Sequence, residues 1–127
     1  MAALVLVIDD SNDALDLATR YLGLKGLQVV TSARTDVVTS LILLRRPDVI
    51  VLDVMMPKMS GSTLAMVIRK SMPNVPIVFY SAIQEDQGRA LAQQHTGARF
   101  VSKTHGLTAL LRAVQDSLQG LARAAKP

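Results

Sequence analysis

Five polar residues come at points where apolar runs of the sequence end, and together they could handle a phosphoryl group. They are three acids, a hydroxyl and an amine: Asp9, Asp10, Asp53, Ser81 and Lys103. Three carboxylates brought together repel one another, and a hard divalent cation removes that conflict. Mg²⁺ suits a site that offers carboxylates, waters and phosphate oxygens. A lysine ammonium and a serine hydroxyl would then hold the phosphoryl oxygens from the other side.

Each of these residues has a simpler explanation when it is taken alone. An aspartate that follows a strand is commonly an N-cap or a turn residue. A serine in that place is commonly a helix cap, and a single lysine is commonly a solvated surface residue. The combination at successive strand ends, rather than any one member, indicates chemistry.

The apolar runs before these residues are expected to be strands of a parallel sheet. They are short and nearly continuous, and they alternate with longer amphipathic segments. The expected strands are 3–8, 27–32, 48–52, 76–82 and 99–102. The expected helices are 12–26, 34–46, 62–72, 84–95 and a last one with Leu107, Leu110, Leu111, Val114, Leu118 and Leu121 at helical spacing. This alternation predicts a single α/β domain with helices on both faces of the sheet.

The expected site lies at the carboxyl edge of that sheet. Ligands of open α/β sheets bind beyond the carboxyl ends of the strands, near the point where the strand order reverses. A flavodoxin-like order would bring the exits of the first and third strands side by side. Asp9, Asp10 and Asp53 would then meet.

Composition excludes several other classes of protein. The chain has 127 residues, enough for one ordinary domain, and no cysteine, which rules out disulfide and thiol chemistry. Its net charge of +4 is scattered, and aromatic residues, at 3%, are too few for a base-stacking surface. The N-terminal apolar run is too short to span a membrane and lacks a basic flank. We therefore expect a soluble, cytoplasmic protein that binds neither nucleic acid nor membrane directly.

Other phosphate-handling motifs are absent from the sequence. There is no G-x-x-x-x-G-K-[ST] loop and no G-x-G-x-x-G loop, so backbone cradling of a nucleotide is disfavoured. Phosphatases of the haloacid dehalogenase type need a second acid two residues after the nucleophile, where this chain has Met55. His95 and His105 lack metal-ligand spacing and are expected to be ordinary surface residues.

Four motifs in this order and spacing resemble the receiver domain of two-component response regulators. They are "VIDD" (7–10), "PDVIVLDVMMPKMSG" (47–61), "PIVFYSA" (76–82) and "GARFVSK" (97–103). The resemblance covers nearly the whole chain. It implies one receiver domain over residues 1–127, with a flavodoxin-like (βα)₅ fold and a parallel sheet of order 2-1-3-4-5.

The same resemblance implies a role for each site residue. Asp53 would be the phosphoacceptor, and Ser81 and Lys103 would bind the phosphoryl oxygens. Mg²⁺ would be organised by the carboxylates and one backbone carbonyl: Asp9, Asp10, Asp53 and Met55. Ser81 and Phe100 would form the conformational switch. The chain would thus catalyse its own phosphorylation and dephosphorylation without being a dedicated enzyme.

The partners implied are proteins. The phosphodonor would be a sensor histidine kinase or a histidine phosphotransfer protein. The output would be a downstream protein or a C-terminal output domain, reached through the face of the fourth helix, fifth strand and fifth helix, and a homodimer of the phosphorylated chain is a further expected assembly. The alternative is a degenerate receiver that acts as a phosphorylation-independent protein-binding scaffold, against which the complete acidic set argues.

The chain departs from the family pattern in three ways. Thr104 follows Lys103 where the family usually has a proline, which bears on the path of the loop into the last helix. Phe100 stands where a tyrosine is common, so a hydroxyl-mediated version of the switch is excluded. The pI near 9.9 is unusually basic for the family.

Overall fold

A computed structural model describes residues 2–125 as five strands that alternate with helices. In chain order the elements are β1 (Leu4–Ile8), α1 (Asn12–Leu24), β2 (Gln28–Ser32), α2 (Val38–Arg45), β3 (Val49–Leu52), α3 (Gly61–Ser71), β4 (Ile77–Ser81), α4 (Glu85–Gln93), β5 (Ala98–Ser102), a 3₁₀ turn (Lys103–His105) and α5 (Gly106–Ala125). All strand pairs are parallel, and the sheet order is β2-β1-β3-β4-β5. The predicted fold class and strand order are confirmed.

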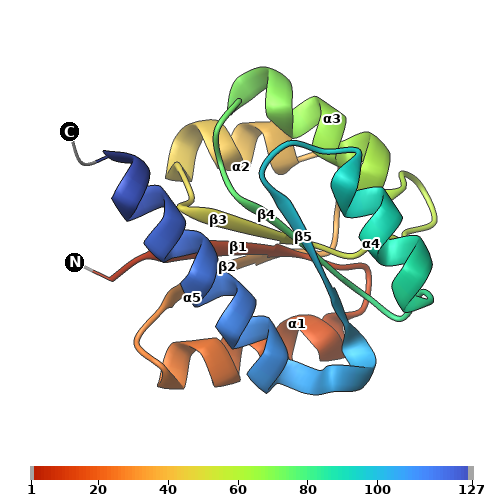
Figure 1. Ribbon diagram of the computed structural model, residues 1–127, viewed down its shortest axis with the longest axis horizontal. Helices are drawn as coiled ribbons and strands as arrows, with labels where there is room; N and C mark the ends of the chain where they lie inside the picture. The colour runs from red at the N-terminus through yellow and green to blue at the C-terminus, as the bar shows by residue number, and fades with distance from the viewer. Residues whose placement is uncertain (1, 126–127) are drawn as a thin grey trace.

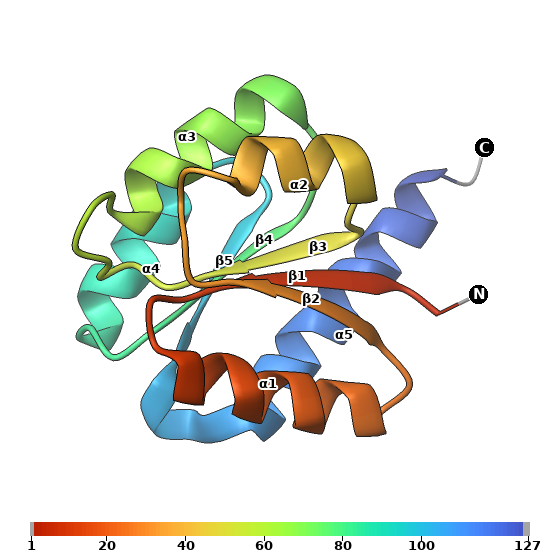
Figure 2. The ribbon, with the colours of Figure 1, turned by 180° about the vertical axis from the view of Figure 1, so that it is seen from behind.

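Two layers of helices enclose the sheet (Figure 1). Helices α2, α3 and α4 cover one face, and α1 and α5 cover the other, as the view from behind also shows (Figure 2). Each face has its own apolar core, the first centred on residues such as Ile50 and Ile68 and the second on residues such as Val51 and Leu110. Neighbouring residues of β3 thus serve opposite cores, as the side-chain alternation of a strand requires. The side chain of Leu121 lies outside the described part of the chain.

The register of the central strands aligns the ends that carry the acids. Ile8 of β1 lies opposite Leu52 of β3, so both strands end at the same level. The next residues are still held by backbone hydrogen bonds: Asp53 N–H donates to the Ile8 carbonyl at 3.0 Å, and Asp9 N–H donates to the Ser32 carbonyl at 3.2 Å. Both aspartates therefore leave the sheet on backbone that is still hydrogen-bonded to a neighbouring strand.

Serine caps fix the starts of two helices beside this edge. The Ser11 hydroxyl accepts a hydrogen bond from Ala14 N–H at the start of α1, and the Ser60 hydroxyl accepts one from Thr63 N–H at the start of α3. Such caps satisfy backbone donors that have no partner within the helix. They place α1 and α3 directly after the loops that follow β1 and β3.

The second helix begins later than the sequence pattern predicts. Residues 34–46 were expected to be helical, but α2 starts at Val38, and its N-cap residue Val37 makes no side-chain capping bond. Residues before it are held in a turn, where the Ser32 hydroxyl donates to the Arg34 carbonyl and Arg34 pairs with Asp36. These local bonds compete with helix formation. No helix within residues 2–125 is both long enough and apolar enough to cross a membrane.

Candidate functional site

Three carboxylates meet at the carboxyl edge of the sheet, as the strand ends predict. Asp9, Asp10 and Asp53 each offer an oxygen within 4.8 Å of the other two. Asp9 and Asp53 are buried, with 4% and 7% of their surface exposed, whereas Asp10 is exposed. The cluster is therefore closed towards the sheet and open on the side of Asp10.

Backbone donors orient the two buried carboxylates. Ser11 N–H donates to Asp9 Oδ1 at 2.9 Å, and Met55 N–H donates to Asp53 Oδ1 at 3.2 Å. Each bond spans two residues and forms a tight turn in which the aspartate side chain holds its own loop. The carboxylates are thus positioned before any ligand arrives.

Lys103 supplies the positive charge of the site. Its Nζ lies 2.6 Å from Asp9 Oδ2 and 3.4 Å from Asp53 Oδ2, so it bridges the acids of β1 and β3. Burial lowers the pKa of this lysine, but its hydrogen bonds and charge interactions with Asp9 and Asp53 outweigh burial and leave the pKa raised. The ammonium also lies 5.8 Å from the ring centroid of Tyr80, a neighbour that no motif in the sequence indicates. Lys103 is therefore protonated at neutral pH and offsets the charge of the acids.

Ser81 lies at the same edge, at the end of β4, next to β3. It is 1% exposed, and its Oγ has no hydrogen-bond partner among the described residues. An unpaired buried hydroxyl costs free energy, so an acceptor brought to this position would be favoured. Ser81 forms no hydrogen bond with the three acids or with Lys103, and the shared strand edge alone brings it near them.

The loop after Asp53 depends on a close approach that only glycine permits. A Cβ atom on Gly61 would overlap the backbone carbonyl oxygen of Asp53 and lie 2.9 Å from the Cα of Val54. Gly61 N–H also donates to the Val54 carbonyl at 2.9 Å. The first turn of α3 therefore rests directly on the backbone that carries Asp53.

The methionines of that loop divide between core and surface. Met56 and Met59 are partly buried and pack against the core on the α3 side of the sheet, where they fill space. Met55 is 66% exposed, beside the acids. Its carbonyl was expected to bind a metal, and that role stays a prediction.

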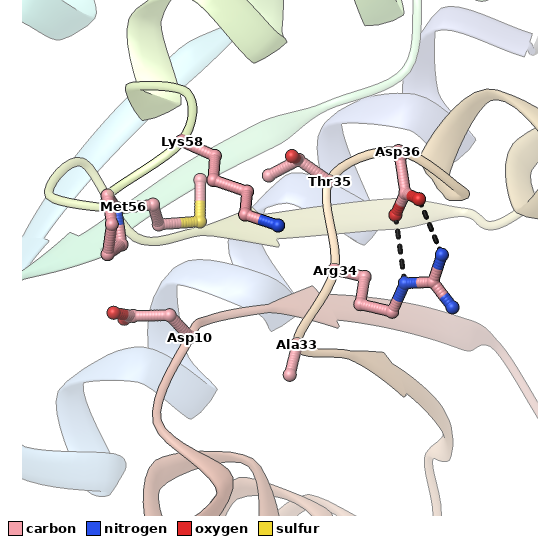
Figure 3. A pocket seen from close by; sticks show the side chains of 8 residues that line it. Asp10, Ala33, Arg34, Thr35, Asp36, Met56 and Lys58 are labelled. Carbon is pink, nitrogen blue, oxygen red and sulfur yellow. Dashed lines mark hydrogen bonds and ion pairs between the residues drawn. The ribbon is translucent and has the colours of Figure 1, made fainter.

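A cavity of about 460 Å³ opens beside Asp10, between the turn after β2 and the loop after β3 (Figure 3). Met56 and the Lys58 ammonium extend into it from one side, and the paired Arg34 and Asp36 stand on the other. The pKa of Asp36 is lowered, first by its hydrogen bond with Arg34 and to a smaller degree by the charge of Lys58. No spacing in the sequence indicates this cavity, because its two walls are joined only by the fold.

His95 is not the ordinary surface residue that the sequence suggests. It is half-buried, its Nε2 lies 3.0 Å from the Ser62 hydroxyl of α3, and its ring centroid lies 5.5 Å from that of Phe79. Burial, and then the nearby charge of Arg69, lower its pKa. His95 therefore links the end of α4 to the start of α3, whereas His105 is exposed, as expected.

Phe100 lies outside the acidic cluster, on β5. It is half-buried on the face that α4 covers and packs against the core of that face. Its Cα partner on β4 is Phe79, and Ser81 and Ser102 form the next pair on the same face. The two residues predicted to form a switch are thus diagonal neighbours in the sheet.

The donor set of this edge suits a hard divalent cation and a phosphoryl group. Carboxylate oxygens in a half-open cluster are the ligands that Mg²⁺ accepts while it keeps waters and phosphate oxygens. An aspartate held by its own backbone turn can act as a nucleophile, and an adjacent ammonium can stabilise the negative charge of an incoming phosphate. The residues present therefore fit the group that the sequence predicts.

Comparisons with known proteins point to one family. The family model described as "Response regulator receiver domain" matches residues 5–115. The response regulator GacA of Pseudomonas aeruginosa is 31% identical over 120 residues, which cover 91% of this chain and 55% of that protein. The chain spans about half the length of curated relatives that it matches.

Solved structures show the same fold. A response regulator receiver domain protein from Clostridium thermocellum superimposes with a TM-score of 0.86 at 23% identity, covering 96% of this chain and 98% of that one. The response regulator TrrA of Thermotoga maritima, solved in complex with Mg²⁺ and a beryllium fluoride, gives a TM-score of 0.80 at 22% identity, covering 91% and 99%. At these identities the likeness concerns the fold alone.

Proposed function

Since the chain belongs to the receiver domain family of response regulators, we propose that it is a phosphorylation-switched signalling module with Asp53 as its phosphoacceptor. The phosphodonor is a phosphohistidine on a sensor kinase or on a phosphotransfer protein. The observation that carries this proposal is the meeting of Asp9, Asp10 and Asp53 with Lys103 at one sheet edge. A scaffold that works without phosphorylation needs no such cluster.

Asp53 acts as the nucleophile in this proposal. One carboxylate oxygen forms a bond to phosphorus while the bond between phosphorus and the donor histidine nitrogen breaks, and the imidazole keeps that electron pair. The Met55 N–H holds the other oxygen, so the attacking group does not rotate freely. Hydrolysis removes the phosphoryl group again. A water oxygen bonds to phosphorus while the bond from phosphorus to the Asp53 oxygen breaks, which releases inorganic phosphate and restores the carboxylate.

Lys103 and Ser81 receive the phosphoryl oxygens. Lys103 already lies 3.4 Å from Asp53, so its ammonium reaches a group bound there with a small movement. The unpaired Ser81 hydroxyl gains the acceptor that the described structure does not give it. Both contacts are charge-assisted hydrogen bonds to an anion, which are stronger than neutral ones.

The residues that would hold Mg²⁺ are Asp9, Asp10 and Asp53, with the Met55 carbonyl as the fourth protein ligand. When bound, the ion neutralises charge on the phosphoryl oxygens during transfer. The solved TrrA structure, with Mg²⁺ and a beryllium fluoride, supports this assignment by its shared fold.

We assign residues 1–127 to one receiver domain, since all five strands belong to one sheet. Its output partner is a downstream protein or an output domain, and the contact surface is the face of α4, β5 and α5. Phosphorylation is expected to favour a homodimer through the same face.

Phosphorylation by acetyl phosphate tests the function without a cognate kinase. With Mg²⁺, the intact chain should gain one phosphoryl group by mass spectrometry, and chelation of the metal should prevent it. Asp53→Asn should remove the gain completely. Asp36→Asn is the matched control, because Asp36 is exposed and pairs with Arg34 away from the cluster. Undiminished labelling of Asp53→Asn would refute the assignment.

A further inference from the structure

The ring of Tyr80 lies beneath the lysine of the candidate site. The Lys103 ammonium is over the face of this ring, 5.8 Å from its centroid. A cation within about 6 Å of an aromatic centroid is attracted by the negative face of the ring. Lys103 therefore contacts two carboxylates and one uncharged aromatic ring.

The sheet fixes the position of the Tyr80 ring. Tyr80 lies on β4, and its Cα partner on β5 is Val101, two residues before Lys103. Both Tyr80 and Val101 are half-buried and pack against the core that α1 and α5 cover. Because packed side chains keep their place, the ring offers the lysine a fixed surface rather than a mobile one.

The two carboxylate partners of Lys103 have another task in the proposed function. Asp9 Oδ2 lies 2.6 Å from the ammonium, and Asp53 Oδ2 lies 3.4 Å from it. Both acids belong to the cluster that would hold Mg²⁺, and Asp53 would also carry the phosphoryl group. The face of an aromatic ring offers no oxygen to a hard cation, which takes oxygen ligands. Tyr80 therefore remains a partner of the lysine whether or not the acids are occupied.

We propose that Tyr80 is a positioning residue whose ring face holds the Lys103 ammonium beside Asp53, ready for the phosphoryl oxygens. This rests on the proposed phosphorylation of Asp53 and adds to it a residue that acts through Lys103 rather than on the phosphoryl group. A lysine has a long flexible stem and loses conformational freedom when its ammonium binds. A ring that restricts the lysine beforehand reduces that cost and favours transfer.

Two substitutions separate the ring of Tyr80 from its bulk. Tyr80→Phe keeps the ring and removes the hydroxyl, whereas Tyr80→Leu keeps an apolar side chain and removes the ring. With acetyl phosphate and Mg²⁺, Tyr80→Leu should gain its phosphoryl group about threefold more slowly than the parent, and Tyr80→Phe should keep the parent's rate. Tyr21→Leu is the matched control, because it removes a ring that lies 5.5 Å from the Lys25 ammonium, and it should also keep the parent's rate. Mass spectrometry of the intact chain over time measures all four rates.

The effect of the ring should disappear when the lysine is absent. In Lys103→Met, the further substitution Tyr80→Leu should leave the residual rate of labelling unchanged, because no ammonium is left to hold. A merely structural role of Tyr80 predicts the same slowing with and without the lysine, and that result would overturn the proposal. A parent-like rate in Tyr80→Leu, or equal slowing in Tyr80→Phe and Tyr80→Leu, would also overturn it.

The proton spectrum of the lysine tests the contact without any phosphorylation. Ring currents shift protons that lie over an aromatic face upfield. The ε-methylene signal of Lys103, assigned by its loss in Lys103→Met, should therefore lie upfield of the signals of exposed lysines such as Lys70. This shift should persist in Tyr80→Phe and after addition of Mg²⁺, and it should vanish in Tyr80→Leu.

The spectrum also separates this inference from the function on which it rests. A parent Lys103 signal at the position of the exposed lysines would overturn the proposal, even if Tyr80→Leu does not fold. Failure of the parent to gain a phosphoryl group would refute the proposed function, while the methylene signal would still test whether the ring holds the lysine.

Discussion

Strand β3 and helix α4 bury very different side chains. All four residues of β3 are buried, with exposures of 0–1%, and neighbouring strands pair with it on both sides. Helix α4 buries a glycine and an alanine, and β5 beneath it is an edge strand. In the proposed function, the reacting carboxylate of Asp53 directly follows the first region, and the proposed output surface includes the second. The proposal thus places rigid positioning and the response in separate parts of one small domain.

Truncation of core side chains should show this contrast most strongly. Ile50→Ala removes a fully buried side chain of β3 and should lower the free energy of unfolding by about 2–5 kcal/mol. Leu91→Ala removes a half-buried side chain of α4 and should cost about half as much. Urea unfolding measures both. Equal losses would contradict the difference between the two regions.

Removal of the positive charge of Lys103 should slow phosphorylation of Asp53 and leave amide exchange of α4 unchanged. Lys103→Met should slow phosphorylation of Asp53 by acetyl phosphate about a hundredfold, because a preorganised donor to the phosphoryl oxygens is lost. Amide exchange of residues 84–95 in the unphosphorylated chain should stay as in the parent. A variant with the parent's rate of labelling would exclude Lys103 from the reaction.

Two apolar residues near the proposed site, exposed Met55 and half-buried Ile83, should lengthen the life of the phosphoryl group. Met55 and Ile83 each lie two residues after a proposed site residue, and neither side chain can orient a hydrolytic water by hydrogen bonding. Met55→Asn, Ile83→Glu and the double variant should therefore lose phosphate several times faster than the parent. Met66→Asn is the matched control, since Met66 is 61% exposed on α3. Unchanged or slower loss would refute this account.

The smallest expected effect concerns the link between α3 and the end of α4. Burial and Arg69 lower the pKa of His95, so the unfolded chain binds a proton more tightly than the folded chain. Stability should therefore be complete above the unfolded pKa of about 6.5 and decline slightly as the pH falls below it, until the folded pKa is passed. His95→Gln should remove this decline in unfolding measured from pH 7.5 to 5. The same decline in His95→Gln would assign it to other groups.

The sequence predicts the centre of the molecule far better than its edge. Buried parallel strands are continuous apolar runs, so β1 and β3 can be located, and the acids at their ends can be expected to meet. Helix α2 is predicted four residues too early, because the segment before Val38 is bound in side-chain turns that hydrophobic spacing does not report. The 3₁₀ turn at Lys103–His105 could not be predicted either, because its residues show no hydrophobic periodicity.

Contacts of individual side chains away from the strand ends could not be predicted. The pairing of Gly88 with Phe100 and of Ser62 with His95 depends on how α4 lies over the sheet. In the sequence, a glycine inside a polar helix indicates only a less stable helix. The structure shows that Gly88 leaves room for the Phe100 ring. The same holds for Arg69, which donates to the carbonyls of Thr96, Met72 and Val75.

The close contact between Gly88 of α4 and Phe100 of β5 bears on the direction in which a signal can pass. A coupling free energy between two sites acts equally on both, whichever is occupied first. A protein that binds α4 more tightly when Asp53 is phosphorylated would therefore raise the equilibrium occupancy of the phosphoryl group on Asp53 without touching it. An output partner bound in this way would also act as an input, and the fraction of phosphorylated chains would depend on how much partner is present.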